Sequence, residues 1–326
     1  MRRPEAVLLL CLVAAPAAVA QAPGPTAPAA TSLRPHPDLL VGTEWLAARL
    51  DSPGVVILHV GRSDSLYRTG HVPGARYLPL AAVATTVRGV PNEFPSPDTM
   101  AATFRDLGVG DRARVVLYGD DAGLLAARAW VALDVLGQGG RASLLDGGWA
   151  KWTAEHRPVE TGAHPPTPAP FTARWHGDRI ASAEWVRDHL RDTAVVFVDA
   201  RPAGPYAGVE PPCPAGATAC VETPPERRGH LPGAWNLWWM ENLVSRDDPT
   251  LKLPQTLAEQ WAQRTGASRP GARTVVTYCH SGMQASFDYF VARYLGYPDV
   301  RLYDGSWAEW SALQPAASYP VEKRTP

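Results

Sequence analysis

What the sequence lacks excludes several classes of protein. The 326 residues carry a formal net charge of −1, so the chain has no excess of basic residues suited to the phosphate backbone of nucleic acid. After residue 20, no apolar run is long enough to span a membrane. Cysteine is scarce, at four residues, so the position of each one is informative. With 45% hydrophobic and 19% charged residues, the chain is expected to fold around sizeable cores.

Residues 1–20 have the pattern of a secretory signal peptide. Met1-Arg2-Arg3 precedes an apolar run from Ala6 to Val13, and small residues ending at Ala20 suit a signal peptidase. We expect cleavage after Ala20, a flexible lead-in over residues 21–33, and a mature protein that is periplasmic or secreted, with no membrane segment.

Three cysteines remain after removal of the signal, which contains Cys11. Cys213 and Cys220 share one proline-rich segment, and in an oxidising compartment we expect a disulfide between them. A metal site formed by this pair with His230 or Cys279 is the alternative, but the spacing matches no zinc pattern and we expect no metal. The disulfide would leave Cys279 as the odd thiol.

Cys279 lies between a predicted strand and a predicted helix. Val275, Val276 and Tyr278 favour a strand, and apolar residues recur at helical spacing from Ala285 onward. Free backbone N–H groups of the loop and first helical turn would stabilise a thiolate here, so we predict a lowered pKa and a nucleophilic cysteine. The alternative is a buried, inert cysteine.

The two halves of the chain repeat one another. The segment Gly229–Ala234 repeats the G-H-x-P-G-A pattern of Gly70–Ala75 after 159 residues, and Asp304–Trp307 repeats the D-G-x-W pattern of Asp146–Trp149 after 158. The near-constant offset indicates a duplicated domain. Strands alternate with helices in each half, which predicts an α/β fold with a mostly parallel sheet flanked by helices.

The expected boundaries follow from this repeat. They are a first domain over residues 34–156, a proline-rich linker over 157–174, and a second domain over 175–320 with the Cys213/Cys220 loop inserted.

Taken together, these motifs resemble the two-domain rhodanese sulfurtransferases. The resemblance covers about residues 35–320 and rests on the paired motifs, on Asp199-Ala200-Arg201, and on one cysteine loop in the second half. It implies two tandem rhodanese-like domains, with Cys279 attacking the sulfane sulfur of a small-molecule donor to form a persulfide. The sulfur then passes to a thiophilic acceptor such as cyanide or a thiol, and no cofactor is needed.

The resemblance also implies that the first domain is structural, because it has no thiol at the matching position. Alignment places Gly119, Asp120 or Asp121 there, and none of these residues carries sulfur.

The donor is expected to be thiosulfate or 3-mercaptopyruvate. Thiosulfate enzymes resemble C-R-K-G-V-T in this loop, and mercaptopyruvate enzymes resemble C-G-S-G-V-T. Here Ser281 and Gly282 favour the second pattern, whereas an arginine expected shortly after Arg201 in that group is replaced near Pro205. His280, if charged, would make donor binding depend on pH; otherwise it is an exposed loop residue. The residues expected to bind the donor are Arg201, His280, Ser281, Gly282, Met283 and Gln284.

Other interpretations of the motifs are weaker. A cysteine phosphatase needs an arginine six positions after the cysteine, where this chain has Ala285. A non-catalytic rhodanese-like binding module in the periplasm is the main alternative function. His71 and His230 are predicted to make structural hydrogen bonds, because both belong to the duplicated motif. The tryptophans at 235, 238 and 239 are expected either in the core or in the wall of the site.

Overall fold

The protein is described by a computed structural model, which defines residues 35–163, 165–209, 221, 223–265 and 274–324. Residues 31–326 group into one compact unit. The predicted signal peptide, the lead-in over residues 21–33, and the Cys213/Cys220 pair lie outside the described residues.

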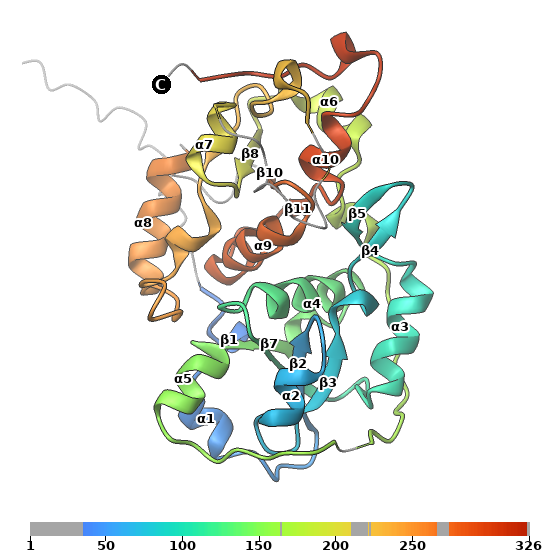
Figure 1. The fold of residues 1–326 in the computed structure, drawn as a ribbon, viewed down its shortest axis with the longest axis vertical. Helices are drawn as coiled ribbons and strands as arrows, with labels where there is room; N and C mark the ends of the chain where they lie inside the picture. The colour runs from blue at the N-terminus through green and yellow to red at the C-terminus, as the bar shows by residue number, and fades with distance from the viewer. Residues whose placement is uncertain (1–34, 164, 210–220, 222, 266–273, 325–326) are drawn as a thin grey trace, which may run out of the picture. The chain divides into compact units, whose positions relative to one another are not determined.

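The first repeat contains a five-stranded parallel sheet (Figure 1). Its strand order is β1-β7-β6-β2-β3, and a separate antiparallel hairpin pairs β4 with β5. The strands are β1 (Leu40–Val41), β2 (Val55–Gly61), β3 (Arg76–Pro79), β4 (Thr85–Val87), β5 (Val90–Glu93), β6 (Arg114–Gly119) and β7 (Ala142–Leu145). The helices are α1 (Thr43–Ala47), α2 (Ser65–Thr69), α3 (Pro97–Asp106), α4 (Leu124–Val135) and α5 (Gly148–Ala154).

The second repeat has a four-stranded parallel sheet in the order β11-β10-β8-β9. An isolated parallel bridge from Ile180 to Leu302 corresponds to the pairing of β1 with β7 in the first repeat. The strands are β8 (Val195–Asp199), β9 (Trp235–Asn236), β10 (Thr274–Tyr278) and β11 (Val300–Leu302). The helices are α6 (Ala183–His189), α7 (Ala203–Ala207), α8 (Pro254–Thr265), α9 (Met283–Leu295) and α10 (Ser306–Trp310). The predicted α/β architecture of two mostly parallel sheets flanked by helices is therefore confirmed.

Helices α4 and α9 join the two repeats, and they lie next to each other in Figure 1. The ring of Trp130 on α4 contacts that of Phe290 on α9 edge to face at 5.0 Å, and Tyr289 donates a hydrogen bond of 2.7 Å to Asp134. One continuous apolar core contains residues of both repeats. This contact brings the cysteine-free repeat against the helix that follows Cys279.

The G-H-x-P-G-A loops have the same structural role in both repeats. His71 and His230 are buried, and each ring Nδ1 lies 2.7–2.8 Å from the carbonyl oxygen of Tyr67 or Tyr206. Each backbone also bridges to a later segment, at Glu160 and Glu322. The predicted structural hydrogen bond of each histidine is confirmed.

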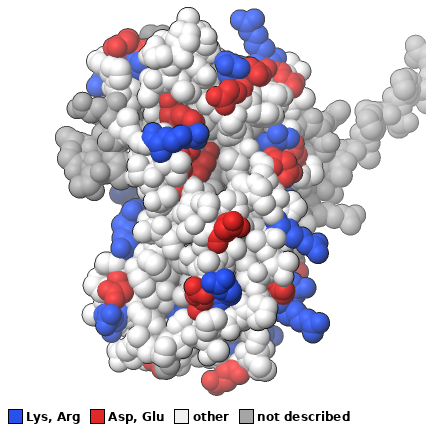
Figure 2. Space-filling model, turned by 90° about the vertical axis from the view of Figure 1, so that its right-hand side faces the viewer, with Lys and Arg blue, Asp and Glu red and all other residues white. Residues whose placement is uncertain are grey.

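Neither the surface charges nor the helices mark out a large patch of one charge or a membrane-spanning segment among the described residues on the views shown. Acidic and basic side chains are interspersed on the face drawn in Figure 2. Among the described residues, none of the helices combines the length and apolar character needed to cross a membrane.

Candidate functional site

Cys279 directly follows β10, at the edge of the sheet where the parallel strands end. Gly282 follows in the left-handed conformation, with φ of 79°, and α9 begins at the next residue. The helix extends two residues further toward Cys279 than its apolar spacing indicated. The predicted strand–cysteine–loop–helix arrangement is present.

The thiol of Cys279 is buried, with 1% of the residue exposed. Burial raises its pKa above the ordinary value, while hydrogen bonds from the backbone N–H groups of Ala285, Ser281 and Gln284 act in the opposite direction. The prediction of a lowered pKa was therefore wrong. The sequence indicated the converging N–H groups, but it did not show how completely the loop removes the sulfur from water.

The second D-G-x-W motif holds the cysteine loop in place. The backbone N–H groups of Cys279 and Gly282 each donate to Ser306 Oγ at 3.1 Å, and this hydroxyl donates to the carbonyl of Tyr303 at 2.8 Å. Trp307 N–H donates to the carbonyl of Cys279 at 3.0 Å. Ser306 adopts φ of 53°, a conformation that non-glycine residues rarely adopt. This motif therefore holds the loop at Cys279 and Gly282.

Arg201 is close enough to Cys279 for their charges to interact, but its guanidinium is largely occupied. It is 1% exposed, it pairs with Asp199 through Nε at 2.9 Å and Nη2 at 2.6 Å, and Nη2 also donates to the carbonyl of Gly229 at 2.7 Å. Its Nη1 is buried without a hydrogen-bond partner among the described residues. The two N–H groups of Nη1 thus remain for a ligand.

His280 differs from both sequence-based interpretations. It is partly buried rather than exposed, and burial together with the charge of Arg201 lowers its pKa to about 4. It is therefore neutral at pH 7, and it offers no positive charge to an anionic donor.

The remaining loop residues differ in their burial and contacts. Ser281 is 7% exposed and accepts a hydrogen bond of 2.8 Å from Asn92 of the first repeat. Met283 is 6% exposed and belongs to the apolar core, whereas Gln284 is partly buried. Of the predicted donor-binding residues, Ser281 and Met283 thus have structural contacts of their own.

The three tryptophans after the second G-H-x-P-G-A motif differ in their burial. Trp239 is 7% exposed in the main core, and Trp238 packs against that core. Trp235 is 44% exposed.

The corresponding loop of the first repeat is built differently. Gly119 ends β6, and a Cβ atom there would lie 2.7 Å from the carbonyl oxygen of Val60. Asp120 Oδ1 lies 3.0 Å from Nε2 of the buried His59. A histidine–carboxylate contact therefore replaces the thiol.

The structure brings two further residues to the cysteine loop that the sequence analysis missed, Arg128 and Asn92. Arg128 is fully buried on α4 and pairs with Asp304 of the second D-G-x-W motif at 2.5 Å. The available sequence signal was that Arg128 is the one charged residue in the apolar run from Leu124 to Leu133.

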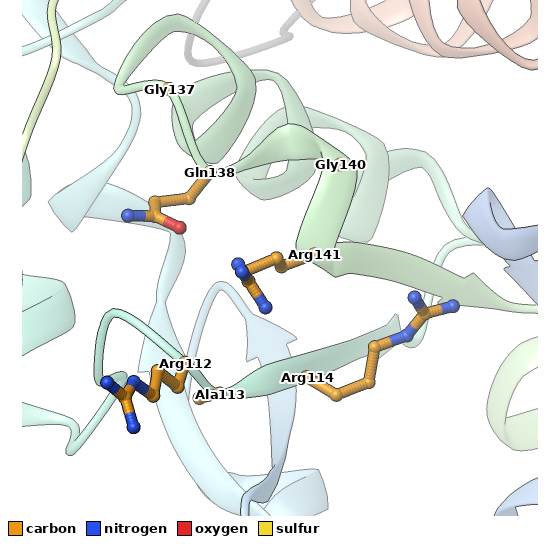
Figure 3. Close-up of a pocket in the computed structure, with 7 residues that line it drawn as sticks. All are labelled: Arg112, Ala113, Arg114, Gly137, Gln138, Gly140 and Arg141. Atoms are coloured by element: carbon orange, nitrogen blue, oxygen red, sulfur yellow. The ribbon is translucent and has the colours of Figure 1, made fainter.

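A cavity of about 420 Å³ lies elsewhere, at the amino end of β6 in the first repeat. Figure 3 shows Arg141 pointing into this space, whereas Arg112 and Arg114 point away from each other. Arg114 already donates to the carbonyl of Asp38, so the three arginines do not converge on one point. Cys279 follows the opposite, carboxyl end of a strand, so this cavity is separate from its loop.

These features define a protein with two rhodanese folds and one buried cysteine loop. The family model described as "Rhodanese-like domain" matches residues 42–155 and 182–313, and the chain belongs to this family.

The curated relatives are sulfur-handling proteins that match over nearly their whole length. The chain is 30% identical over 292 residues to the 3-mercaptopyruvate sulfurtransferase of Escherichia coli K12, covering 86% of this chain and 97% of the relative. It is 29% identical over 274 residues to the thiosulfate sulfurtransferase of Pseudomonas aeruginosa, covering 83% and 93%. It is 32% identical over 286 residues to the sulfur carrier protein TtuD of Thermus thermophilus, covering 85% and 95%.

Solved structures support the same fold. The crystal structure of the 3-mercaptopyruvate sulfotransferase SseA from Escherichia coli aligns with a TM-score of 0.69 at 27% identity, over 82% of this chain and 98% of that one. The EanB complex with ergothioneine aligns with a TM-score of 0.75 at 23% identity, over 89% and 71%, and shows the fold alone.

Proposed function

We propose that the protein is a sulfurtransferase that carries sulfur as a persulfide on Cys279. The observation that carries this proposal is the position of the Cys279 thiol, which accepts hydrogen bonds from three backbone N–H groups of the loop and the first turn of α9. The sulfurtransferase names of the curated relatives support it.

In the first half-reaction the Cys279 thiolate attacks the transferable sulfur of the donor, which is the outer sulfur of thiosulfate or the thiolate sulfur of 3-mercaptopyruvate. A sulfur–sulfur bond forms, and the bond from that sulfur to the rest of the donor breaks. With thiosulfate the bonding pair leaves with sulfite, and with 3-mercaptopyruvate it leaves as the enolate of pyruvate, which takes up a proton. The enzyme is left as a persulfide anion, whose charge the three N–H groups stabilise.

In the second half-reaction an acceptor nucleophile attacks the outer sulfur of the persulfide. The Cys279 thiolate is the leaving group, so the enzyme returns to its starting state. Cyanide becomes thiocyanate, and a thiol acceptor becomes a persulfide itself. No metal or organic cofactor takes part in either step.

The donor is anionic in both cases, and Arg201 Nη1 is the group we propose for its recognition. His280 is neutral at pH 7, so the cysteine loop itself supplies no cation beside Arg201. The loop therefore lacks the cationic character of the thiosulfate pattern, but Pro205 is buried in α7 where the mercaptopyruvate pattern has an arginine. Both donors are retained as candidates.

Mass spectrometry of the intact protein tests the proposal. The protein is incubated with thiosulfate or, separately, with 3-mercaptopyruvate, and Cys279→Ser is the control. We expect the wild type to gain one sulfur atom, to lose it on addition of cyanide, and the variant to gain none. Because burial raises the pKa of Cys279, uptake should still increase as the pH rises above neutrality.

Absence of sulfur uptake from either donor, with Cys279 shown to be reduced, would refute the proposal. The result would then favour a non-catalytic rhodanese-like binding module.

A further inference from the structure

Arg128 joins the cysteine-free repeat to the segment that holds Cys279. It projects from α4 and is fully buried. Its Nη1 and Nη2 reach the two carboxylate oxygens of Asp304 at 2.5 and 3.2 Å, and Nη1 lies 3.3 Å from Ser286 Oγ on α9. Backbone carbonyls of its own repeat accept its remaining donors, those of Val83 and Asn92. The guanidinium is thus fixed on one side by the first repeat and on the other by the second.

The pair of Arg128 and Asp304 packs directly against Gly282. A Cβ atom at Gly282 would lie 2.6 Å from Asp304 Oδ1 and 3.2 Å from Arg128 Nη1. Beside it, Asn92 Nδ2 donates to Ser281 Oγ at 2.8 Å. Asn92 therefore binds Ser281 directly, and Arg128 holds Asp304 in place against Gly282.

The corresponding place on the other side of the molecule lacks both side chains. The two D-G-x-W aspartates make reciprocal contacts, because Asp304 accepts from the N–H of Phe94 at 2.7 Å and Asp146 accepts from that of Leu251 at 2.9 Å. Because this pair of contacts occurs on both sides, the packing of one repeat against the other is enough to explain it.

Arg128 and Asn92 have no such counterpart. Arg128 lies five residues after Gly123, the left-handed residue before α4, and the residue five positions after Gly282 is Phe287. Phe94 and Leu251 have equivalent roles in the two reciprocal contacts, and the residues two positions before them are Asn92 and Pro249. Only the side that contains the cysteine has the two polar side chains.

We infer that Arg128 and Asn92 are positioning residues through which the cysteine-free repeat fixes the conformation of the Cys279 loop. The backbone N–H groups can converge on Cys279 only if Ser281 and Gly282 stay in place. A buried arginine paired with a carboxylate defines this position more strictly than apolar contact does, since its geometry is directional. The inference rests on the proposed function, but its first measurement does not require sulfur transfer.

Hydrogen–deuterium exchange of the peptide covering residues 279–286 is that measurement. In Asn92→Gly, which tolerates the left-handed backbone (φ of 62°) and removes the side chain that donates to Ser281, exchange should accelerate about fivefold. In Arg128→Met, which leaves the buried Asp304 without its cationic partner, it should accelerate at least about tenfold. Arg128→Lys should restore part of the protection.

Asp146→Ala is the matched control. It removes the reciprocal contact to Leu251 and weakens the interface, but it should leave exchange at 279–286 within about twofold of the wild type. Steady-state sulfur transfer from the donor to cyanide, measured on the same proteins, should show a lower kcat with little change in KM for the Arg128 and Asn92 variants only.

The outcomes separate the inference from the proposed function. Unchanged exchange at 279–286 in both Asn92→Gly and Arg128→Met, or equal acceleration in Asp146→Ala, would overturn the inference even if the wild type takes up sulfur. Accelerated exchange in a protein that never takes up sulfur would support the positioning role and refute the sulfurtransferase proposal.

Discussion

Replacement of Ser306 by alanine tests whether the second D-G-x-W motif holds the cysteine loop. Ser306 is fully buried, and its hydroxyl accepts the backbone N–H groups of both Cys279 and Gly282. Alanine at the same φ of 53° carries the same backbone strain, so the two residues differ mainly in the hydroxyl. A buried N–H group left without an acceptor costs about 1–3 kcal/mol, so two such groups give a loss of about 2–6 kcal/mol in the free energy of unfolding.

Urea denaturation followed by tryptophan fluorescence measures this loss, and mass spectrometry measures sulfur uptake in parallel. Ser306→Gly is the control, because glycine relieves the strain and should recover about 1 kcal/mol relative to alanine. Gly148 holds the corresponding position in the first repeat, with φ of 51°. A loss below about 1 kcal/mol in Ser306→Ala, with sulfur uptake unchanged, would refute the assigned role of the hydroxyl.

Three further predictions concern ionisation and the first repeat. Burial, Asp304 and Glu309 raise the pKa of Glu93 from 4.5 to about 7, against the lowering effect of nearby arginines. The folded state thus binds the proton of the Glu93 carboxyl more tightly than the unfolded state does. The stability contributed by the protonated carboxyl is lost as the pH rises through about 7. Glu93→Gln should therefore raise Tm relative to the wild type, by an amount that grows between about pH 5 and pH 8; a constant difference would contradict the assignment. His280→Asn should leave the pH profile of sulfur uptake unchanged between about pH 6 and pH 8, because His280 is already neutral there, and a lost inflection in that range would show otherwise. Gly119→Cys should lower Tm and create no second sulfur site, since its Cβ would lie 2.7 Å from the carbonyl oxygen of Val60; a second sulfur atom in the intact mass would contradict this.

The fold was predictable because its signals are local and occur twice. Buried parallel strands are short apolar runs, and the helices show apolar spacing, as at Val55–Gly61 and Met283–Leu295. The paired loops and the common offset then indicated two copies of one unit. The position of Cys279 followed from the same local pattern.

The electrostatic surroundings of the site were less predictable. The ionisation of Cys279 and His280 depends on how completely other segments cover them, and no local pattern contains that information. Arg128 is 176 residues away from Asp304 in the chain, so their ion pair was not visible in either repeat alone. Its sequence signal was one charged residue within the apolar run from Leu124 to Leu133, which is informative only once the helix is known to be buried.

The two repeats thus diverged in the contacts around one loop while their folds stayed alike. The second repeat has the thiol of Cys279, and Ser306, in strained backbone geometry, binds the loop of this cysteine. The first repeat has Gly148 in place of Ser306, and it has the contact of Asp120 with His59 in place of the thiol. The loss of a thiol alone would not require Arg128 to be buried against Asp304. A buried ion pair generally adds little net stability compared with apolar packing of similar volume. The ion pair of Arg128 with Asp304 is found on the cysteine side only, and Phe287 occupies the position that matches Arg128 on the other side. The pair is therefore better explained by the need to position Ser281 and Gly282 than by adhesion between the repeats.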